Sequence, residues 1–174
     1  MKAASILTLA TLLLGSGCDI ALLPETASYD GAGTPRMAVV IAAEAMPEGN
    51  VEAVDLELVD VLLHRESDDT WVWVGGDASR VELTPIAMDR AESVPMLADH
   101  YDRVLLVIDA PRVASGGVWH AIALADDELE LAVDLDLDAD TRIELHFDVA
   151  ASLSGDAPAA WSFSPQVRAE LISE

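Results

Sequence analysis

The sequence predicts an all-β protein that folds as a single antiparallel β-sandwich of eight or nine short strands. Three observations favour this fold class. Segments of alternating apolar and polar residues, or of uninterrupted apolar residues, recur through residues 36–172. Glycine, proline, asparagine or aspartate marks a turn about every ten residues between these segments. No segment has a convincing helical period, so helices are not expected to build the core.

The first strand patterns lie in residues 37–63. Residues 37–43 are a continuous apolar run of small and β-branched residues, which is typical of a buried strand. After a turn, residues 54–63 alternate between apolar and polar side chains, but the alternation slips by one position. Such a slip moves every later side chain to the opposite face unless a bulge absorbs it. A β-bulge is therefore expected near Leu58 and Val59.

A polar hairpin turn is predicted at residues 66–69. Residues 71–74 then form a short strand that stops before Gly75 and Gly76, and residues 81–86 form another. Residues 87–100 have no clear period, so we expect a connection that contains a helical turn.

The second half of the domain has the clearest strand patterns. Residues 103–109 form a strongly apolar strand that is expected to end at Pro111. Residues 118–124 follow a glycine turn and are predicted to form the next strand. Residues 129–137 and 143–147 alternate strictly between apolar and polar side chains and predict two more strands. The last pattern, residues 161–167, is interrupted by Pro165, which predicts an edge strand.

The charge of the chain is strongly negative. Its 174 residues include 32 Asp and Glu against nine Lys and Arg, giving a formal net charge of −23, and the only lysine is Lys2. This charge repels nucleic acid and anionic lipid headgroups, so a nucleic-acid partner is not expected. It is consistent with a solvated acidic coat suited to a saline habitat, or with a site for cations or basic partners.

The N-terminus has the pattern of an export signal. Met1 and Lys2 precede an apolar run at residues 6–14, and the small residues 15–17 lead directly to Cys18. The run is too short to span a bilayer. These features predict a signal peptide at residues 1–17, an anchor and flexible tether at residues 18–35, and the sandwich domain at residues 36–172.

The small residues before Cys18 resemble the bacterial lipobox, in which the cysteine becomes the first mature residue and carries thioether-linked and amide-linked acyl chains. The match departs at Gly15, where the lipobox usually has leucine. An ordinary signal cleaved nearby, which would leave a free thiol, is the alternative. Two or more acyl chains give stable membrane anchoring, so we expect a lipoprotein of the cell envelope. The residue after the cysteine, Asp19, does not decide whether this lipoprotein is anchored in the inner or in the outer membrane.

Several segments, taken in order, resemble domain-of-unknown-function family 4382, a family of bacterial and archaeal surface lipoproteins. The similar segments are EAMP at 44–47, VDLELVDVLLHR at 54–65, YDRVLLV at 101–107, LHFDVAAS at 145–152 and FSPQVR at 163–168. The resemblance covers roughly residues 36–172 and implies an immunoglobulin-like or prealbumin-like sandwich on a lipid anchor. It brings no catalytic residues with it.

No catalytic or cofactor-binding motif is recognisable. The sequence has no Gly-x-Ser-x-Gly elbow and no glycine-rich phosphate loop, and its four histidines lack metal-ligand spacing. The acidic run of Asp134, Asp136, Asp138 and Asp140 could bind calcium weakly, but it lacks the glycine and the final carboxylate of an EF-hand loop. A solvated strand face explains the run equally. We expect a protein that is not an enzyme and has no cofactor.

Trp71 and Trp73 are two residues apart, so on a strand they share one face. They could lie in the core, or Val72 and Val74 could do so and leave the two indoles on the surface. An exposed pair could stack on sugar rings or anchor a protein interface. Two functions follow: a structural or protein-interaction role at the envelope, favoured by a buried pair, or a glycan- or calcium-binding module, favoured by an exposed one.

Overall fold

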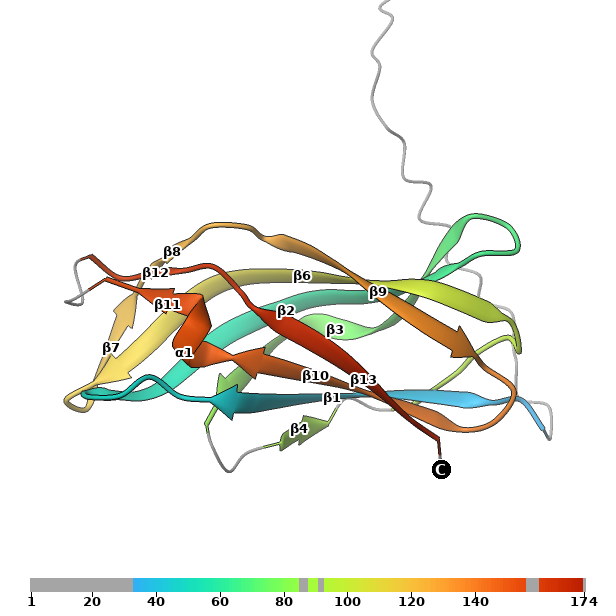
Figure 1. The fold of residues 1–174 in the computed structure, drawn as a ribbon, viewed down its shortest axis with the longest axis horizontal. Helices are drawn as coiled ribbons and strands as arrows, with labels where there is room; N and C mark the ends of the chain where they lie inside the picture. The colour runs from blue at the N-terminus through green and yellow to red at the C-terminus, as the bar shows by residue number, and fades with distance from the viewer. Residues whose placement is uncertain (1–32, 85–87, 91–92, 156–159, 174) are drawn as a thin grey trace, which may run out of the picture.

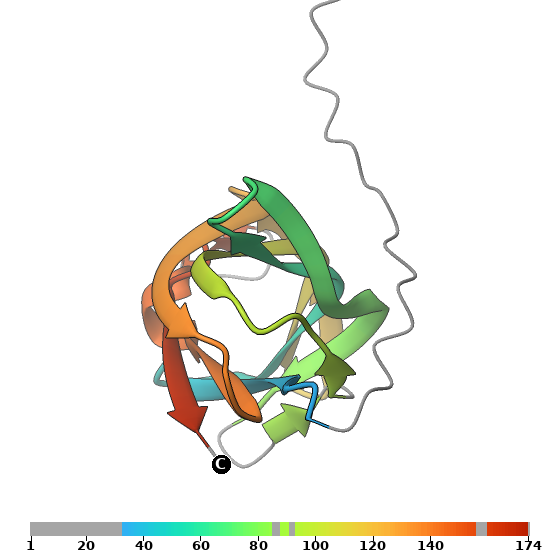
Figure 2. The same cartoon turned by 90° about the vertical axis from the view of Figure 1, so that its right-hand side faces the viewer.

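The computed structural model describes residues 33–84, 88–90, 93–155 and 160–173, and this part of the chain is all-β (Figure 1). It contains thirteen strands and one four-residue helix, and five of the strands have only two or three residues. Two main sheets, here called sheet A and sheet B, lie on opposite sides of the interior (Figure 2). The predicted all-β sandwich is confirmed. Residues 1–17 and Cys18 lie outside the described residues.

Sheet A is built around β1 (Arg36–Ala45), which pairs with β10 (Thr141–Asp148) on one side. β4 (Met88–Arg90) and β5 (Val94–Pro95) pair with its other side. β13 (Val167–Ser173) pairs with β10 and forms an edge of the sheet, as predicted for the last strand. The β1–β10 pair is parallel, unlike the antiparallel pairing expected, because all of sheet B rather than a hairpin separates these strands in the chain.

Sheet B consists of long antiparallel strands. β2 (Val51–Arg65) lies between β3 (Thr70–Leu83) and β6 (His100–Ser115). The first half of β6 also pairs with β9 (Glu128–Asp136), and its last residues pair with β7 (Val118–Ala121). The turns predicted at residues 66–69 and at the glycines before β7 are confirmed.

A small third sheet and the helix lie at the end of the molecule where β7 lies (Figure 1). The sheet joins β11 (Leu153–Ser154), β12 (Ser162–Phe163) and β8 (Ala123–Leu124). Helix α1 (Val149–Ser152) was not predicted, since one turn is too short to show a period. The Asp148 carboxylate caps this turn by accepting a hydrogen bond from the backbone N–H of Ala151 at 2.8 Å.

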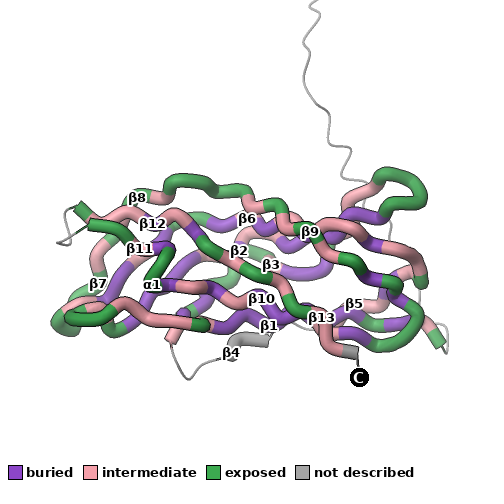
Figure 3. Tube along the Cα trace, viewed as in Figure 1, coloured by how far each residue is buried: buried purple, intermediate pink, exposed green. Residues whose placement is uncertain are grey.

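The apolar core lies between sheets A and B, where the buried residues of their strands face one another (Figure 3). Aliphatic side chains fill most of it. The largest side chains with less than 2% exposure include Tyr101, Phe147, Phe163, Leu56, Leu63, Leu106, Ile143 and Leu145. Along each strand, core side chains alternate with side chains that point away from the core. The outward-pointing side chains form the outer faces of sheets A and B.

The predicted β-bulge is confirmed and lies at Val59. The register of β2 shifts between Leu58 and Asp60 in its pairing with both β3 and β6. Leu58 and Val61 are therefore both buried in the core, although three positions separate them. Beyond the bulge, Leu62 and His64 point to the outer face of sheet B.

Three predicted element boundaries are wrong. The strands predicted at 71–74 and 81–86 are one strand, β3, because a bend with positive φ at residues 76–78 keeps the chain paired with β2. Pro111 does not end β6, because Ala110 and Pro111 together lie opposite Leu56 in a bulge that requires no proline N–H. The predicted connection at 87–100 contains β4 and β5, and its described residues form no helical turn.

Candidate functional site

Trp71 and Trp73 lie on the outer face of sheet B. Their neighbours Val72 and Val74 face inward: Val74 is fully buried and Val72 packs against the core. Since alternate residues of a strand point to opposite faces, both indoles point away from the core. Trp73 is 47% exposed, whereas Trp71 is half-buried. Of the two placements that the sequence left open, the structure has the surface one.

An apolar strip crosses the outer face beside these tryptophans. Leu62 on β2 is in register with Trp73 on β3 and with Leu105 on β6. Val107 lies one outward position further along β6. Neighbours in register on one face have Cβ atoms about 5 Å apart, so the four side chains form a continuous surface. Leu62 is only 6% exposed yet lies outside the core cluster, which means that the surrounding strip covers it.

Carboxylates adjoin the apolar strip in two places. Asp60 accepts a hydrogen bond from the indole N–H of Trp73 at 3.1 Å. Along the β9 edge of the strip, Glu130 is in register with Leu105 and Glu128 with Val107. Both glutamates are exposed, because β9 alternates them with leucines that pack against the core. The strip is therefore an apolar surface with an acidic edge at β9 and a further carboxylate, Asp60, next to Leu62 on β2.

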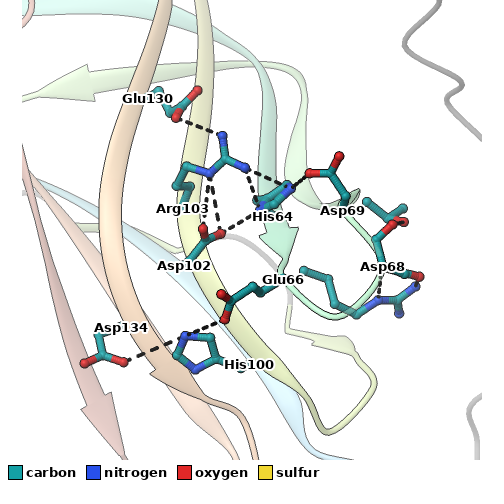
Figure 4. Close-up of polar contacts among 11 residues, drawn as sticks. His64, Glu66, Asp68, Asp69, His100, Asp102, Arg103, Glu130 and Asp134 are labelled. Atoms are coloured by element: carbon teal, nitrogen blue, oxygen red, sulfur yellow. Dashed lines mark hydrogen bonds and ion pairs between the residues drawn. The ribbon is translucent and has the colours of Figure 1, made fainter.

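A polar cluster surrounds His64 (Figure 4). It adjoins the apolar strip, because His64 is the next outward residue of β2 after Leu62. The His64 ring is 4% exposed, and its Nδ1 lies 2.6 Å from a carboxylate oxygen of Asp102. Its Nε2 lies 2.9 Å from a carboxylate oxygen of Asp69 in the β2–β3 turn. An Arg103 guanidinium nitrogen lies within 2.9 Å of both ring nitrogens, so the guanidinium crosses the ring. The Trp71 ring centroid is 5.0 Å from that of His64 and 5.2 Å from the Arg103 guanidinium carbon.

This His64 cluster has the chemistry of a structural ion-pair network. The contacts of His64 are with two carboxylates, a guanidinium and an indole, so each ring nitrogen is engaged. The hydrogen bond from His64, aided by the positive charge of Arg103, lowers the pKa of Asp102. The hydrogen bond to Glu130 raises the pKa of Arg103. The cluster ties the β2–β3 turn to β6 and holds Trp71 in place beside the strip.

A second group of charges surrounds His100 at the same end of sheet B (Figure 4). Its Nδ1 lies 2.9 Å from an oxygen of Asp136, and its Nε2 lies 3.6 Å from Glu66 and 3.9 Å from Asp134. The hydrogen bond to Asp136 is the main cause that raises the pKa of His100. In the neighbouring turn, the Arg65 guanidinium lowers the pKa of Asp68 to about 2.

The predicted acidic run is not gathered into one site. Asp134 and Asp136 lie on the outer face of β9 beside His100, and Asp138 is exposed in the following loop. Asp140 instead accepts a hydrogen bond from the backbone N–H of Arg36 at 2.9 Å. Within the described ranges, no three His, Cys, Asp or Glu side chains are placed to hold a metal ion. Asp134 and Asp136 thus lie on a solvated strand face, and Asp138 and Asp140 lie in the loop that follows it.

A further exposed tryptophan, which the sequence did not single out, lies towards the other end of the same face. Trp119 on β7 is 40% exposed, and the Arg112 guanidinium carbon lies 5.2 Å from its ring centroid. Arg112 also bonds Asp55 at 2.8 Å, and Arg80 binds the same carboxylate. The signal in the sequence was a pair of large apolar residues directly after the glycine turn. The apolar strip was missed because its members come from three strands, and β6 is distant in the chain from β2 and β3.

Comparisons with family models, with curated proteins and with solved structures find no match to this chain. The resemblance to domain-of-unknown-function family 4382 therefore stays a prediction. No helix in the described part of the chain is long and apolar enough to cross a membrane.

Proposed function

We propose that this protein is a non-catalytic, lipid-anchored protein of the cell envelope that binds a protein partner through the outer face of sheet B. The observation that carries the proposal is the exposure of Trp73, 47%, within the apolar strip. Exposure of the tryptophans was expected to favour a glycan- or calcium-binding module, but the ring continues into the apolar side chains Leu62 and Leu105, which favour a protein partner over a sugar. An exposed tryptophan on a continuous apolar surface with a polar rim is the usual centre of a protein interface. Strand pairing on both sides of Leu62 holds this surface rigid, which limits the entropy lost on binding.

The arrangement around His64 supports binding rather than catalysis. A general base needs a ring nitrogen that can reach a substrate proton. Each nitrogen of His64 already has a carboxylate partner, and the ring is buried. The cluster acts on the binding face by fixing Trp71.

The membrane anchor rests on the sequence. Cys18 ends the export signal and is the only cysteine of the chain. Acylation there, followed by a tether up to residue 35, would leave the outer face of sheet B free to meet partners near the membrane.

Cross-linking in intact cells tests the binding face. The same cross-linked proteins are expected with the wild type and with Trp119→Ala, and they should be lost with Trp73→Ala. Trp119 is the matched control because it is equally an exposed tryptophan but lies far along the sheet. An identical set from all three proteins would refute the proposal.

Metabolic labelling tests the anchor. Cells grown with labelled palmitate should label the wild-type protein and leave Cys18→Ser unlabelled. Equal labelling of both proteins would refute lipidation at Cys18.

A glycan is the second candidate partner, and it is favoured by the Asp60 carboxylate beside the exposed Trp73 ring. Aromatic rings stack on sugars, and neighbouring carboxylates accept hydrogen bonds from sugar hydroxyls. Retention of a neutral polysaccharide by the wild type and not by Trp73→Ala, without any cross-linked protein, would favour this candidate.

A further inference from the structure

We infer that the partner of the outer face of sheet B is a basic polypeptide segment, which places two cationic side chains on the borders of the apolar strip and an apolar side chain between them. This inference rests on the proposed binding function and specifies the chemistry of the partner. It follows from an interaction that the protein already makes twice within its own chain.

The internal interaction is an arginine that covers a tryptophan ring and also pairs with a carboxylate. Arg103 lies over Trp71 and bonds Glu130 at 3.2 Å. Arg112 lies over Trp119 and bonds Asp55 at 2.8 Å. Each arginine thus combines a cation–π contact with an ion pair, and its alkyl stem covers apolar surface.

Trp73 also has a carboxylate beside it, but among the described residues no arginine covers its ring. Asp60 lies at its indole N–H, and the ring is more exposed than those of the other two tryptophans. A guanidinium or ammonium group supplied by a partner would complete the arrangement beside Trp73 and Asp60.

The β9 edge of the strip offers a second place for a cation. Glu128 is in register with Val107, which is in register with Asp60. Arg103 is in contact with Glu130 and Asp102, so the cation nearest to this border is already shared between two carboxylates. Glu128 lies one outward position beyond Glu130 on β9 and adds a further negative charge to this edge.

The width of the apolar strip sets the spacing of the partner's side chains. From Trp73 to Glu130 the face crosses four neighbouring strands, which is about 14 Å at 4.8 Å for each step. In an extended peptide, side chains at positions i, i+2 and i+4 share one face and span about 13 Å. A segment with a cation, an apolar residue and a cation at these positions therefore matches the Trp73 ring, the Leu62–Leu105 surface and the Glu130 edge of β9. Asp60 and Glu128 lie in the neighbouring row, about 10 Å apart with Val107 between them, and each is within reach of one of the two long cationic side chains.

The overall charge of the protein also selects this partner. A net charge of −23 attracts a cationic segment and repels an acidic one, and it speeds the encounter at low salt. The pairing of the two cations with carboxylates fixes where on the outer face the segment binds, because these carboxylates adjoin the apolar strip.

Two labelled peptides provide the direct test, measured by fluorescence anisotropy with the full chain. One has the core Arg-Ser-Leu-Ser-Arg and the other has Glu-Ser-Leu-Ser-Glu at the same positions. We expect the basic peptide to bind at least about tenfold more tightly, and its affinity to fall between 0.05 M and 0.5 M sodium chloride as the ion pairs are screened. Equal binding of the two peptides, or no binding of the basic one, overturns the inference.

Variants assign the effect to the two borders. Asp60→Asn with Glu128→Gln should weaken the basic peptide about fivefold and flatten the salt dependence, since each exposed ion pair contributes modestly. Trp73→Ala should weaken it at least as much. The control, Glu48→Gln with Asp138→Asn, removes the same charge from exposed loop positions and should leave the affinity unchanged. Equal losses in the border and control variants would overturn the inference.

The cellular experiment separates this inference from the proposed function. Cross-linking that depends on Trp73 but is unchanged by the Asp60→Asn, Glu128→Gln variant keeps the binding face and overturns the basic partner. Cross-linking that does not depend on Trp73 overturns the proposed function itself.

Discussion

Gly76 lies directly against the bulge at Val59, so that a Cβ atom on Gly76 would be 2.5 Å from the Val59 carbonyl oxygen. Its φ of +112° is also one that residues with a side chain rarely adopt. The bulge decides which side chains of β2 face outward, and Gly76 is what allows β3 to follow it. The orientation of Leu62 and the placement of Trp73 beside it therefore depend on this glycine.

Gly76→Ala is expected to destabilise the domain by about 2–4 kcal/mol, because it adds a steric clash to an unfavourable backbone conformation. Urea unfolding measures this change. Gly117→Ala is the control: it too has positive φ, +73°, but nothing lies within 4 Å of its added Cβ. It should cost only about 1 kcal/mol. Equal costs at the two glycines would contradict the close approach at the bulge.

The tryptophans of the outer face should contribute little to stability compared with the core. Trp73→Ala is expected to lower the free energy of unfolding by less than about 1 kcal/mol, since the ring is exposed. Trp71→Ala should cost about 1–2 kcal/mol through its contacts with His64 and Arg103. Phe147→Ala, at a fully buried position, should cost about 3–5 kcal/mol. A cost for Trp73→Ala as large as that for Phe147→Ala would mean that Trp73 supports the core.

Features that depend only on the residue pattern within one strand could be predicted from the sequence. The slip in residues 54–63 was visible as a change of period, so the bulge at Val59 could be predicted. The orientation of β3 could not, because tryptophan and valine are both apolar and a period of two does not say which face is inward. The apolar strip depends on register between β2 and β6, which no local pattern encodes.

The buried state of His64 was missed for a related reason. The alternation of this strand, continued to position 64, places His64 on its polar side, and His64 does point to the outer face of sheet B. It is nevertheless 4% exposed, because Trp71, Arg103 and the turn carboxylate Asp69 cover it. Burial on an outer face requires long side chains from neighbouring strands, and their positions emerge only when the strands pair. The same holds for His146, which lies largely covered on the outer face of sheet A.

Acid should weaken the wild type more than a variant that lacks Asp102. The pKa of Asp102 is lowered in the folded protein by the hydrogen bond from His64, so the unfolded chain takes up the proton first as the pH falls. The stability from this group is present above the ordinary pKa of about 3.9 and is lost as the pH falls through the lower folded value. Carboxylates titrate between about pH 5 and about pH 2. As the pH is lowered through this range, the difference in unfolding free energy between wild type and Asp102→Asn should therefore shrink.

Urea unfolding at a series of pH values measures this difference. Asp138→Asn is the control, since it removes an exposed carboxylate from the loop after β9. A wild-type to Asp102→Asn difference that stays constant over the acid range would contradict the link between His64 and Asp102.

His100 should produce the opposite pH dependence near neutrality. The hydrogen bond to Asp136 raises the pKa of His100, so the folded protein holds this proton more tightly than the unfolded chain. The stability from His100 is fully present below the unfolded pKa of about 6.5 and is lost as the pH rises through the higher folded value. The wild type should therefore lose its advantage over His100→Gln as the pH rises from about 6 to about 8. Asp136→Asn removes the main partner and should abolish most of that loss, because the charged ring then has only the more distant Glu66 and Asp134. The ring is partly exposed, so high salt should reduce the effect in the wild type. If Asp136→Asn retained the full pH dependence, the raised pKa would have to come from another group in the cluster.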